Sequence, residues 1–116
     1  MQMNAQAHRA YGAASGYRSL REQEADVFRR VNGALRAARN AGPIQRVRAL
    51  ADNRRLWSAV SDLLRDPANA LPRELRAALV SVGFTVQREM DADKPDFEFL
   101  IAVNENIAAG LGGTAP

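Results

Sequence analysis

The stretch GPIQRVRALADNRRLWSAVSDLLRDP, residues 42–67, decides the fold because it contains one whole helix with its start and its stop. Pro43 suits the first turn of a helix, where its missing N–H would have no partner. Pro67 disfavours helical geometry at Asp66. We therefore predict a helix from about Ile44 to Arg65. Its apolar side chains recur at helical spacing and should form the inward stripe: Ile44, Val47, Leu50, Ala51, Trp57, Val60 and Leu64.

The residues before this stretch predict a short helix followed by a long one. The short helix covers Asn4 to Ala14, and Ser15-Gly16 after it permits a turn. Ser19 precedes Glu22 by three positions, which is the spacing of a capping box. The long helix should therefore begin at Leu20, and Gly42-Pro43 should end it. Its expected inward stripe is Leu20, Val27, Val31, Ala34, Leu35 and Ala38.

Two further helices are expected after this stretch. A loop from Asp66 to Leu71 leads to Pro72, which can open a helix, and the acidic segment Asp91 to Pro95 ends that helix. Asp96 caps or flanks the last helix. The stripe of the first of these helices is Leu75, Leu79, Val82, Val86 and Met90. The last helix carries Phe97, Leu100, Ile101, Asn104, Ile107, Ala108 and Leu111. The glycines Gly110, Gly112 and Gly113 should end it.

The composition is that of an ordinary globular protein. Hydrophobic residues make up 47% of the 116 positions and charged residues 25%, and alternating β-branched or aromatic runs are almost absent. The chain is long enough for one core but not for two. We therefore predict an all-α, single-domain helical bundle over residues 1–116, with four main helices plus a short N-terminal helix. We expect residues 1–18 to be mobile and residues 112–116 to form a flexible tail.

The residue types that catalysis draws on are scarce. There is no Cys, and the only histidine, His8, lies in the segment expected to be mobile. Acids cluster between Asp91 and Glu98, but the glycine and terminal glutamate of a calcium loop are missing. We expect a non-enzymatic protein with no catalytic residue, metal or cofactor. Because neither a secretory signal nor a stretch long enough to span a bilayer occurs, we expect a cytoplasmic protein without a membrane partner.

Polar side chains interrupt two of the apolar stripes. Asn53 and Arg54 fall on or beside the stripe that carries Trp57, and Asn104 falls between Ile101 and Ile107. An unpaired buried amide costs roughly 1 to 3 kcal/mol. Our hypothesis is that these polar groups and the loop backbone of residues 69–71 satisfy one another and set the register of two helices. Trp57 occupies a stripe position and is expected in the core.

Arginines dominate the first half of the chain. Up to Ser58 there are 11 Arg against four acids, whereas five basic residues meet nine acids afterwards. This asymmetry could attract an acidic partner, including RNA, or simply keep helix faces solvated. Arg21, Arg29, Arg36 and Arg39 form a basic strip, but no aromatic residues interleave with it, as platforms for single-stranded nucleic acid require. Phe28 flanks the apolar stripe and is the better candidate for a half-exposed contact residue.

Several motifs together resemble the FlaF family of flagellar biosynthesis regulators. The resemblance runs from Ala10-Tyr11 to Gly110-Leu111. Its most specific stretch is Asn53-Arg54-Arg55-Leu56-Trp57-Ser58. It continues through Asp66 and Asn69-Ala70-Leu71-Pro72, then Leu75-Arg76-Ala77 and Val80-Ser81, and finally Leu100-Ile101, Val103-Asn104 and Ile107. The chain departs from the family pattern at Ser81-Val82-Gly83-Phe84-Thr85, where an aromatic residue is displaced and a glycine introduced.

The resemblance implies a non-enzymatic cytoplasmic partner of flagellin, acting with the translational regulator FlbT in flagellin production or export. Flagellin ends in long amphipathic segments, and a helical bundle can receive the apolar face of such a segment in a groove. We expect the groove between the helix that begins at Leu20 and the next helix, or beside the N-terminal helix. Its expected lining is Phe28, Val31, Leu35 and Tyr11. The motif residues expected to be structural are Asn53, Arg54, Arg55, Leu56, Trp57, Asn69, Leu71, Pro72 and Asn104. The alternative is an RNA-binding regulator of the flagellin message, although a direct nucleic-acid partner is less expected, and the oligomeric state stays open.

Overall fold

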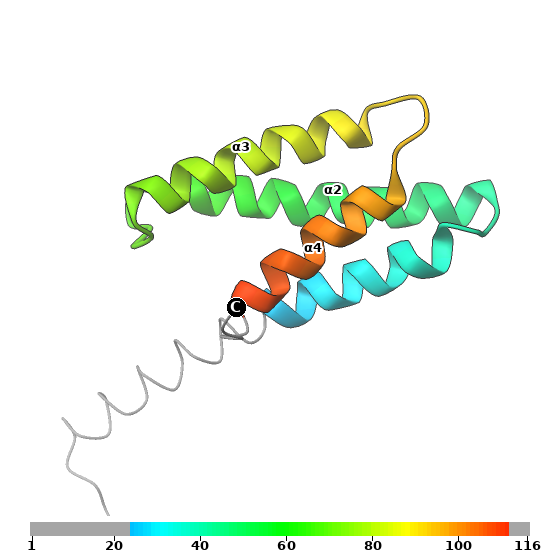
Figure 1. Cartoon of the computed structure of the whole chain (residues 1–116), viewed down its shortest axis with the longest axis horizontal. Coiled ribbons are helices and arrows are strands. Elements are labelled where there is room, and N and C mark those ends of the chain that lie inside the picture. The colour runs from blue at the N-terminus through cyan, green and yellow to red at the C-terminus, as the bar shows by residue number, and fades with distance from the viewer. Residues whose placement is uncertain (1–23, 112–116) are drawn as a thin grey trace, which may run out of the picture.

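The computed structural model describes residues 24–111, which form four helices and no strand (Figure 1). Residues 24–38 are helical and are called the 24–38 helix below. It is followed by α2 (Pro43–Arg65), α3 (Arg73–Met90) and α4 (Phe97–Leu111). The all-α prediction is confirmed. The expected short helix of residues 4–14, the expected helix start at Leu20 and the tail lie outside the described residues.

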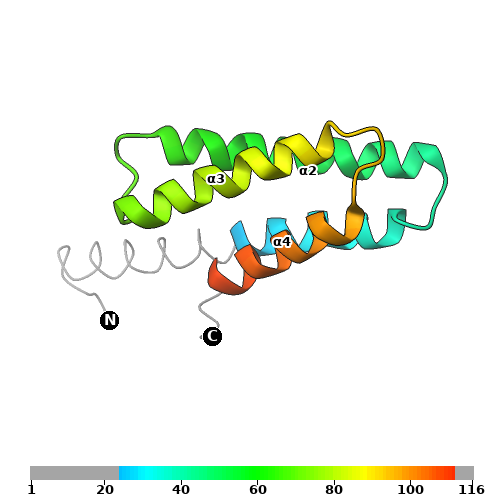
Figure 2. The same cartoon turned by 45° about the horizontal axis from the view of Figure 1, so that its top comes forward.

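The four helices are arranged as two antiparallel pairs. The α2 and α3 helices lie side by side as a hairpin, and α4 runs back along the 24–38 helix (Figures 1 and 2). Asn32 donates a hydrogen bond to the Ile101 carbonyl, and Arg36 forms an ion pair with Glu105, so contacts join the second pair along its length. The buried side chains of all four helices form one core.

The expected ends of α2 and the expected starts of α3 and α4 agree with the structure to within about a residue, whereas the 24–38 helix ends four residues before Gly42, where its end was expected. Pro43 is the first residue of α2, and Asp66 caps its end in extended geometry. Pro72 directly precedes α3. Asp96 caps α4, because its Oδ1 accepts a hydrogen bond from the Phe99 N–H at 3.1 Å. The sequence punctuation therefore located the turns of the described chain.

The predicted inward stripes were wrong in part. Ile44 and Val47, predicted to face inward, are 70% and 66% exposed, because they lie on another side of α2 from Ala49 and Asn53, which face the core. On the 24–38 helix, Phe28 is buried and Val27 is largely exposed, the reverse of the expectation. The buried face of that helix includes Asn32, and a stripe fitted to apolar residues alone is rotated away from it.

A chain of buried hydrogen bonds joins α2, α3 and α4. Trp57 Nε1–H donates to Asn104 Oδ1 at 3.0 Å, and Asn104 Nδ2 donates to Asn53 Oδ1 at 2.8 Å. Asn53 Nδ2 donates in turn to the sulfur of Met90 at 3.1 Å. All four side chains are almost completely buried. The predicted pairing of Asn53 with Asn104 is thus present. Trp57 lies in the core as expected and packs edge-on against Phe28, with 5.9 Å between the two ring centres.

Arg54 and the loop of residues 69–71 do not join this chain, which corrects the rest of the hypothesis. Arg54 reaches the end of α3 instead, where it donates to the Met90 carbonyl at 2.7 Å and pairs with Asp91 at 2.5 Å. Such a cation satisfies carbonyls that a helix end leaves free. Asn69 Nδ2 donates to the Leu63 carbonyl at the end of α2, Asn69 Oδ1 accepts from the Leu71 N–H, and the Asn69 carbonyl accepts from Arg76, so the loop is held locally.

Replacing Asn104 by alanine should lower the free energy of unfolding by about 1 to 3 kcal/mol, because the indole N–H of Trp57 and the side-chain oxygen Oδ1 of Asn53 would stay buried without a partner. Urea denaturation followed by Trp57 fluorescence measures the change. Asn106→Ala is the matched control, since Asn106 is an exposed amide on the same helix. A loss of only a few tenths of a kcal/mol in Asn104→Ala would contradict the structural importance of the hydrogen-bond chain.

Candidate functional site

An apolar groove lies between α2 and α3. Its volume is about 360 Å³, and its lining residues are Ser58, Ser61, Asp62, Leu64, Arg65, Val80, Gly83, Phe84 and Gln87. The α3 wall carries Val80 and Phe84, which are 38% and 66% exposed. The α2 wall carries the short side chains of Ser58 and Ser61. Val80 and Phe84 thus place exposed apolar area beside the hollow, which makes the groove a candidate contact surface.

Gly83 of α3 faces the ring of Trp57 on α2 beside this groove. A Cβ atom placed on Gly83 would lie 3.8 Å from that ring, which is an ordinary contact distance, so there is room for a methyl group against the buried indole. Phe84, the next residue, points away from the core stripe of α3 and stays exposed. The departure from the family motif at these positions therefore falls on the groove itself.

The residues predicted to line a groove lie elsewhere. Phe28 and Leu35 are buried in the core, and Val31 is partly buried against it. Among the described residues these side chains therefore pack in the core and do not line an open groove between the 24–38 helix and α2, while the alternative location beside the N-terminal helix lies outside the described residues. Tyr11 lies outside the described residues. The sequence signal for the observed groove is Phe84, an aromatic residue off the stripe that runs from Leu75 to Met90.

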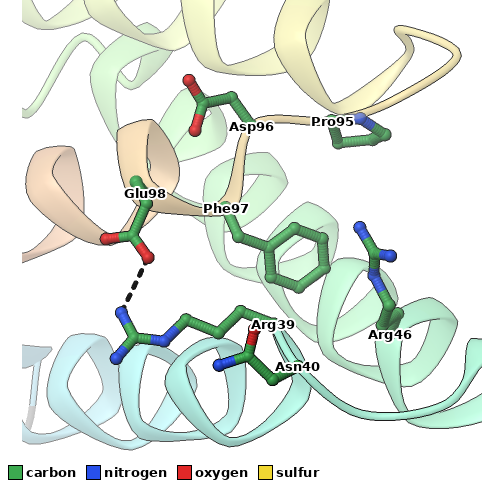
Figure 3. A pocket seen from close by; sticks show the side chains of 7 residues that line it. All are labelled: Arg39, Asn40, Arg46, Pro95, Asp96, Phe97 and Glu98. Atoms are coloured by element: carbon green, nitrogen blue, oxygen red, sulfur yellow. Dashed lines mark hydrogen bonds and ion pairs between the residues drawn. The ribbon is translucent and has the colours of Figure 1, made fainter.

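A second hollow, of about 430 Å³, lies where the 24–38 helix turns into α2 and meets the start of α4. It is polar (Figure 3). The Arg39 guanidinium pairs with Glu98 at 2.7 Å, and Arg46 stands over the Phe97 ring at 5.0 Å from its centre. Both cations therefore interact with residues of α4. These contacts hold the start of α4 against the end of the 24–38 helix and the start of α2.

The uneven charge distribution is compensated within the fold. Three ion pairs between different elements each join an arginine of the first half to an acid of the second: Arg36 with Glu105, Arg39 with Glu98, and Arg54 with Asp91. Arg29 pairs with Asp26 within its own helix. Three of the four arginines of the expected basic strip therefore have acidic partners, and Arg21 lies outside the described residues.

Among residues 24–111, no group of three or more His, Cys, Asp or Glu side chains is placed to hold a metal ion. In the same part of the chain, every helix is too short or too polar to cross a membrane.

Comparison with protein families decides the assignment that the motifs suggested. The family model described as flagellar protein FlaF matches residues 7–111. The chain belongs to the FlaF family. The match covers all four described helices and includes the buried amides, the Asn69 loop and the groove of this FlaF-family protein. Searches of curated proteins and of solved structures gave no significant match.

The packing of Gly83 generates a prediction about stability. Gly83→Ala should raise the free energy of unfolding by up to about 1 kcal/mol, because alanine favours the helix and its methyl group would meet Trp57 at ordinary contact distance. Gly33→Ala is the control for helix propensity alone, since nothing lies within 4 Å of a Cβ atom there. A clear destabilisation by Gly83→Ala alone, in thermal or urea unfolding, would show that the contact with Trp57 is tighter than described.

Proposed function

We propose that this FlaF-family protein binds flagellin in the cytoplasm as an export-assisting chaperone, and that it supports flagellin synthesis together with FlbT. Membership of a flagellar protein family supports the pathway. The observation that carries the binding proposal is the groove between α2 and α3, whose wall leaves Phe84 and Val80 in water. Work of this kind needs a recognition surface and no chemical step.

The groove suits the apolar ridge of an amphipathic helix. Ser58 and Ser61 have short side chains, so a guest helix can approach α2 closely, while Val80 and Phe84 supply apolar area on the other side. Burying an exposed phenylalanine side chain fully contributes about 1.5 to 3 kcal/mol. Asp62 and Arg65 carry opposite charges at the same groove and can orient the polar face of the guest.

In this proposal, occupation of the groove keeps an assembly-prone flagellin segment away from other flagellin molecules. A helix whose apolar face is covered cannot use that face for polymerisation. The proposed link to flagellin synthesis follows from the same complex, because the amount of bound flagellin would set how much free protein is available to FlbT. RNA binding is less favoured, since Arg29, Arg36 and Arg39 already have acidic partners at the surface of the bundle.

Phe84→Ser should weaken binding of monomeric flagellin by more than about tenfold, because an aromatic anchor of an interface typically contributes about 2 kcal/mol or more. Isothermal titration of the purified protein with flagellin measures the dissociation constant. Ile44→Ser is the matched control: Ile44 is exposed to a similar extent on α2 but does not line the groove. Both variants should keep the unfolding free energy of the parent protein.

Equal affinity of both variants would place the flagellin site outside the groove, and no complex with the parent protein at micromolar concentration would remove the proposal.

The salt dependence of the affinity distinguishes flagellin binding from RNA binding. Binding to an apolar groove should change little between about 50 and 200 mM salt, whereas binding of RNA should weaken steeply as released counterions are replaced. Titrating the flagellin message under both conditions tests the alternative directly.

A further inference from the structure

The groove between α2 and α3 has two different ends. At one end, Arg54 of α2 forms an ion pair at 2.5 Å with Asp91, which directly follows α3. Arg54 lies one turn before the lining residue Ser58 on the same side of α2, so this ion pair bounds the groove. The opposite end, where the chain passes from α2 to α3, is called the turn end of the groove below.

One side of α3 carries the groove lining and continues to the turn end. Val80, Phe84 and Gln87 line the groove at intervals of four and three residues. The same spacing, continued backwards, leads to Ala77 and to Arg73, the first residue of α3. Arg73 is exposed. It therefore stands at the turn end, on the side of α3 that faces the groove.

The α2 helix contributes a second cation at the same end. Arg65, the last residue of α2, lines the groove and is exposed. In the described part of the chain, neither Arg65 nor Arg73 forms an ion pair, whereas three other arginines each reach an acid of another element. Two guanidinium groups are therefore available for a partner at the turn end.

The acids nearby do not cancel these two charges. Glu74 follows Arg73 directly and therefore points about 100° away from it around the axis of α3. Asp66 accepts a backbone hydrogen bond within its own loop. Asp62 is the acid among the lining residues, and it stands against both Arg65 and Arg73. The groove side of the hairpin thus keeps a surplus of positive charge at the turn end.

The position of Arg73 does not serve the stability of its own helix. The N-terminus of a helix carries the positive pole of the helix dipole, so a cation in the first turn is disfavoured. Arg65, by contrast, lies in the last turn of α2, where a cation is favoured. An exposed cation at a disfavoured position beside an apolar groove is better suited to contact an anionic group of a partner.

We propose that the flagellin segment that enters the groove is an acidic amphipathic helix. Its apolar ridge covers Val80 and Phe84, and a carboxylate of the same helix contacts Arg73 and Arg65 at the turn end. This inference rests on the proposed binding of flagellin in the groove and adds the chemistry of the guest. A charge contact at the edge of an interface mainly raises the association rate and fixes the direction in which the guest lies.

Reversing the charge of Arg73 tests the contact. Arg73→Glu should lower the association rate constant for monomeric flagellin by at least about fivefold, measured by stopped-flow mixing with the full chain. The same variant should keep or raise the free energy of unfolding, because an acid is favoured in the first turn of α3. A loss of binding without a loss of stability therefore separates contact with the guest from a structural role.

Arg30→Glu is the matched control, because Arg30 is equally classed as exposed and lies on the 24–38 helix, which does not line the groove. Both variants change the net charge by the same amount. An equal effect of the two on the association rate would show that only the overall charge matters and would overturn the proposal.

A chemical crosslink identifies the carboxylate directly. Lys94 is the only lysine of the chain, and Arg73→Lys adds an amine while keeping the positive charge. A zero-length carbodiimide should join this amine to flagellin at least about threefold more efficiently than the amine of Arg30→Lys, because contact raises the effective concentration of the carboxylate. Mass spectrometry then locates the acid, which should lie in an amphipathic segment.

A crosslink yield for Arg73→Lys no higher than that for Arg30→Lys would contradict the proposed contact. The outcome with Phe84→Ser distinguishes this failure from a failure of the proposed function. If Phe84→Ser still weakens flagellin binding, the guest occupies the groove without the ionic contact. If Phe84→Ser also has no effect, the groove itself is not the flagellin site.

Discussion

The buried amides of Asn53 and Asn104 constrain the whole bundle, because each can be satisfied only when α2 and α4 stand in one register. Asn104 accepts from Trp57 and donates to Asn53, which donates to Met90, so three helices share one line of hydrogen bonds. Sliding either helix by a residue would leave polar atoms without partners in an apolar core. Hydrophobic packing alone tolerates such shifts far better.

Helix boundaries followed from local chemistry and were therefore readable in the sequence. Pro43, the Asp66-Pro67 pair and Asp96 each act on the backbone within a few residues, which is why the ends of α2 and the start of α4 lie where they were expected. The bond between Asn53 and Asn104 was also foreseen, because a polar residue on an apolar stripe demands a partner.

Helix faces were harder to assign, because they depend on neighbours that are distant in sequence. Asn32 is buried and donates to the Ile101 carbonyl, yet a count of apolar residues passes over it and so places Phe28 at the margin. Ile44 and Val47 have a helical spacing suited to burial, but they lie on another side of α2 from the residues that face the core. The groove was missed because it depends on the meeting of α2 and α3, which no local pattern reports.

The hairpin presents two different faces to its surroundings. One side packs on the 24–38 helix and α4 through the core, while the other carries the groove beside Gly83 and Phe84. Ion pairs between the two halves of the chain tie the rest of the bundle together at its surface. Binding at the groove can therefore proceed without opening the core that holds the fold.

The hydrogen bond between Asn104 and Asn53 links residues 51 positions apart, and the one from Trp57 to Asn104 spans 47. The α2–α3 hairpin, by contrast, is made of neighbours in the chain and can form early. During synthesis on the ribosome, the indole of Trp57 consequently lacks its acceptor until α4, the last described helix, has emerged. Until then the hairpin can form, but the buried hydrogen bonds of Trp57 and Asn53 to α4 cannot.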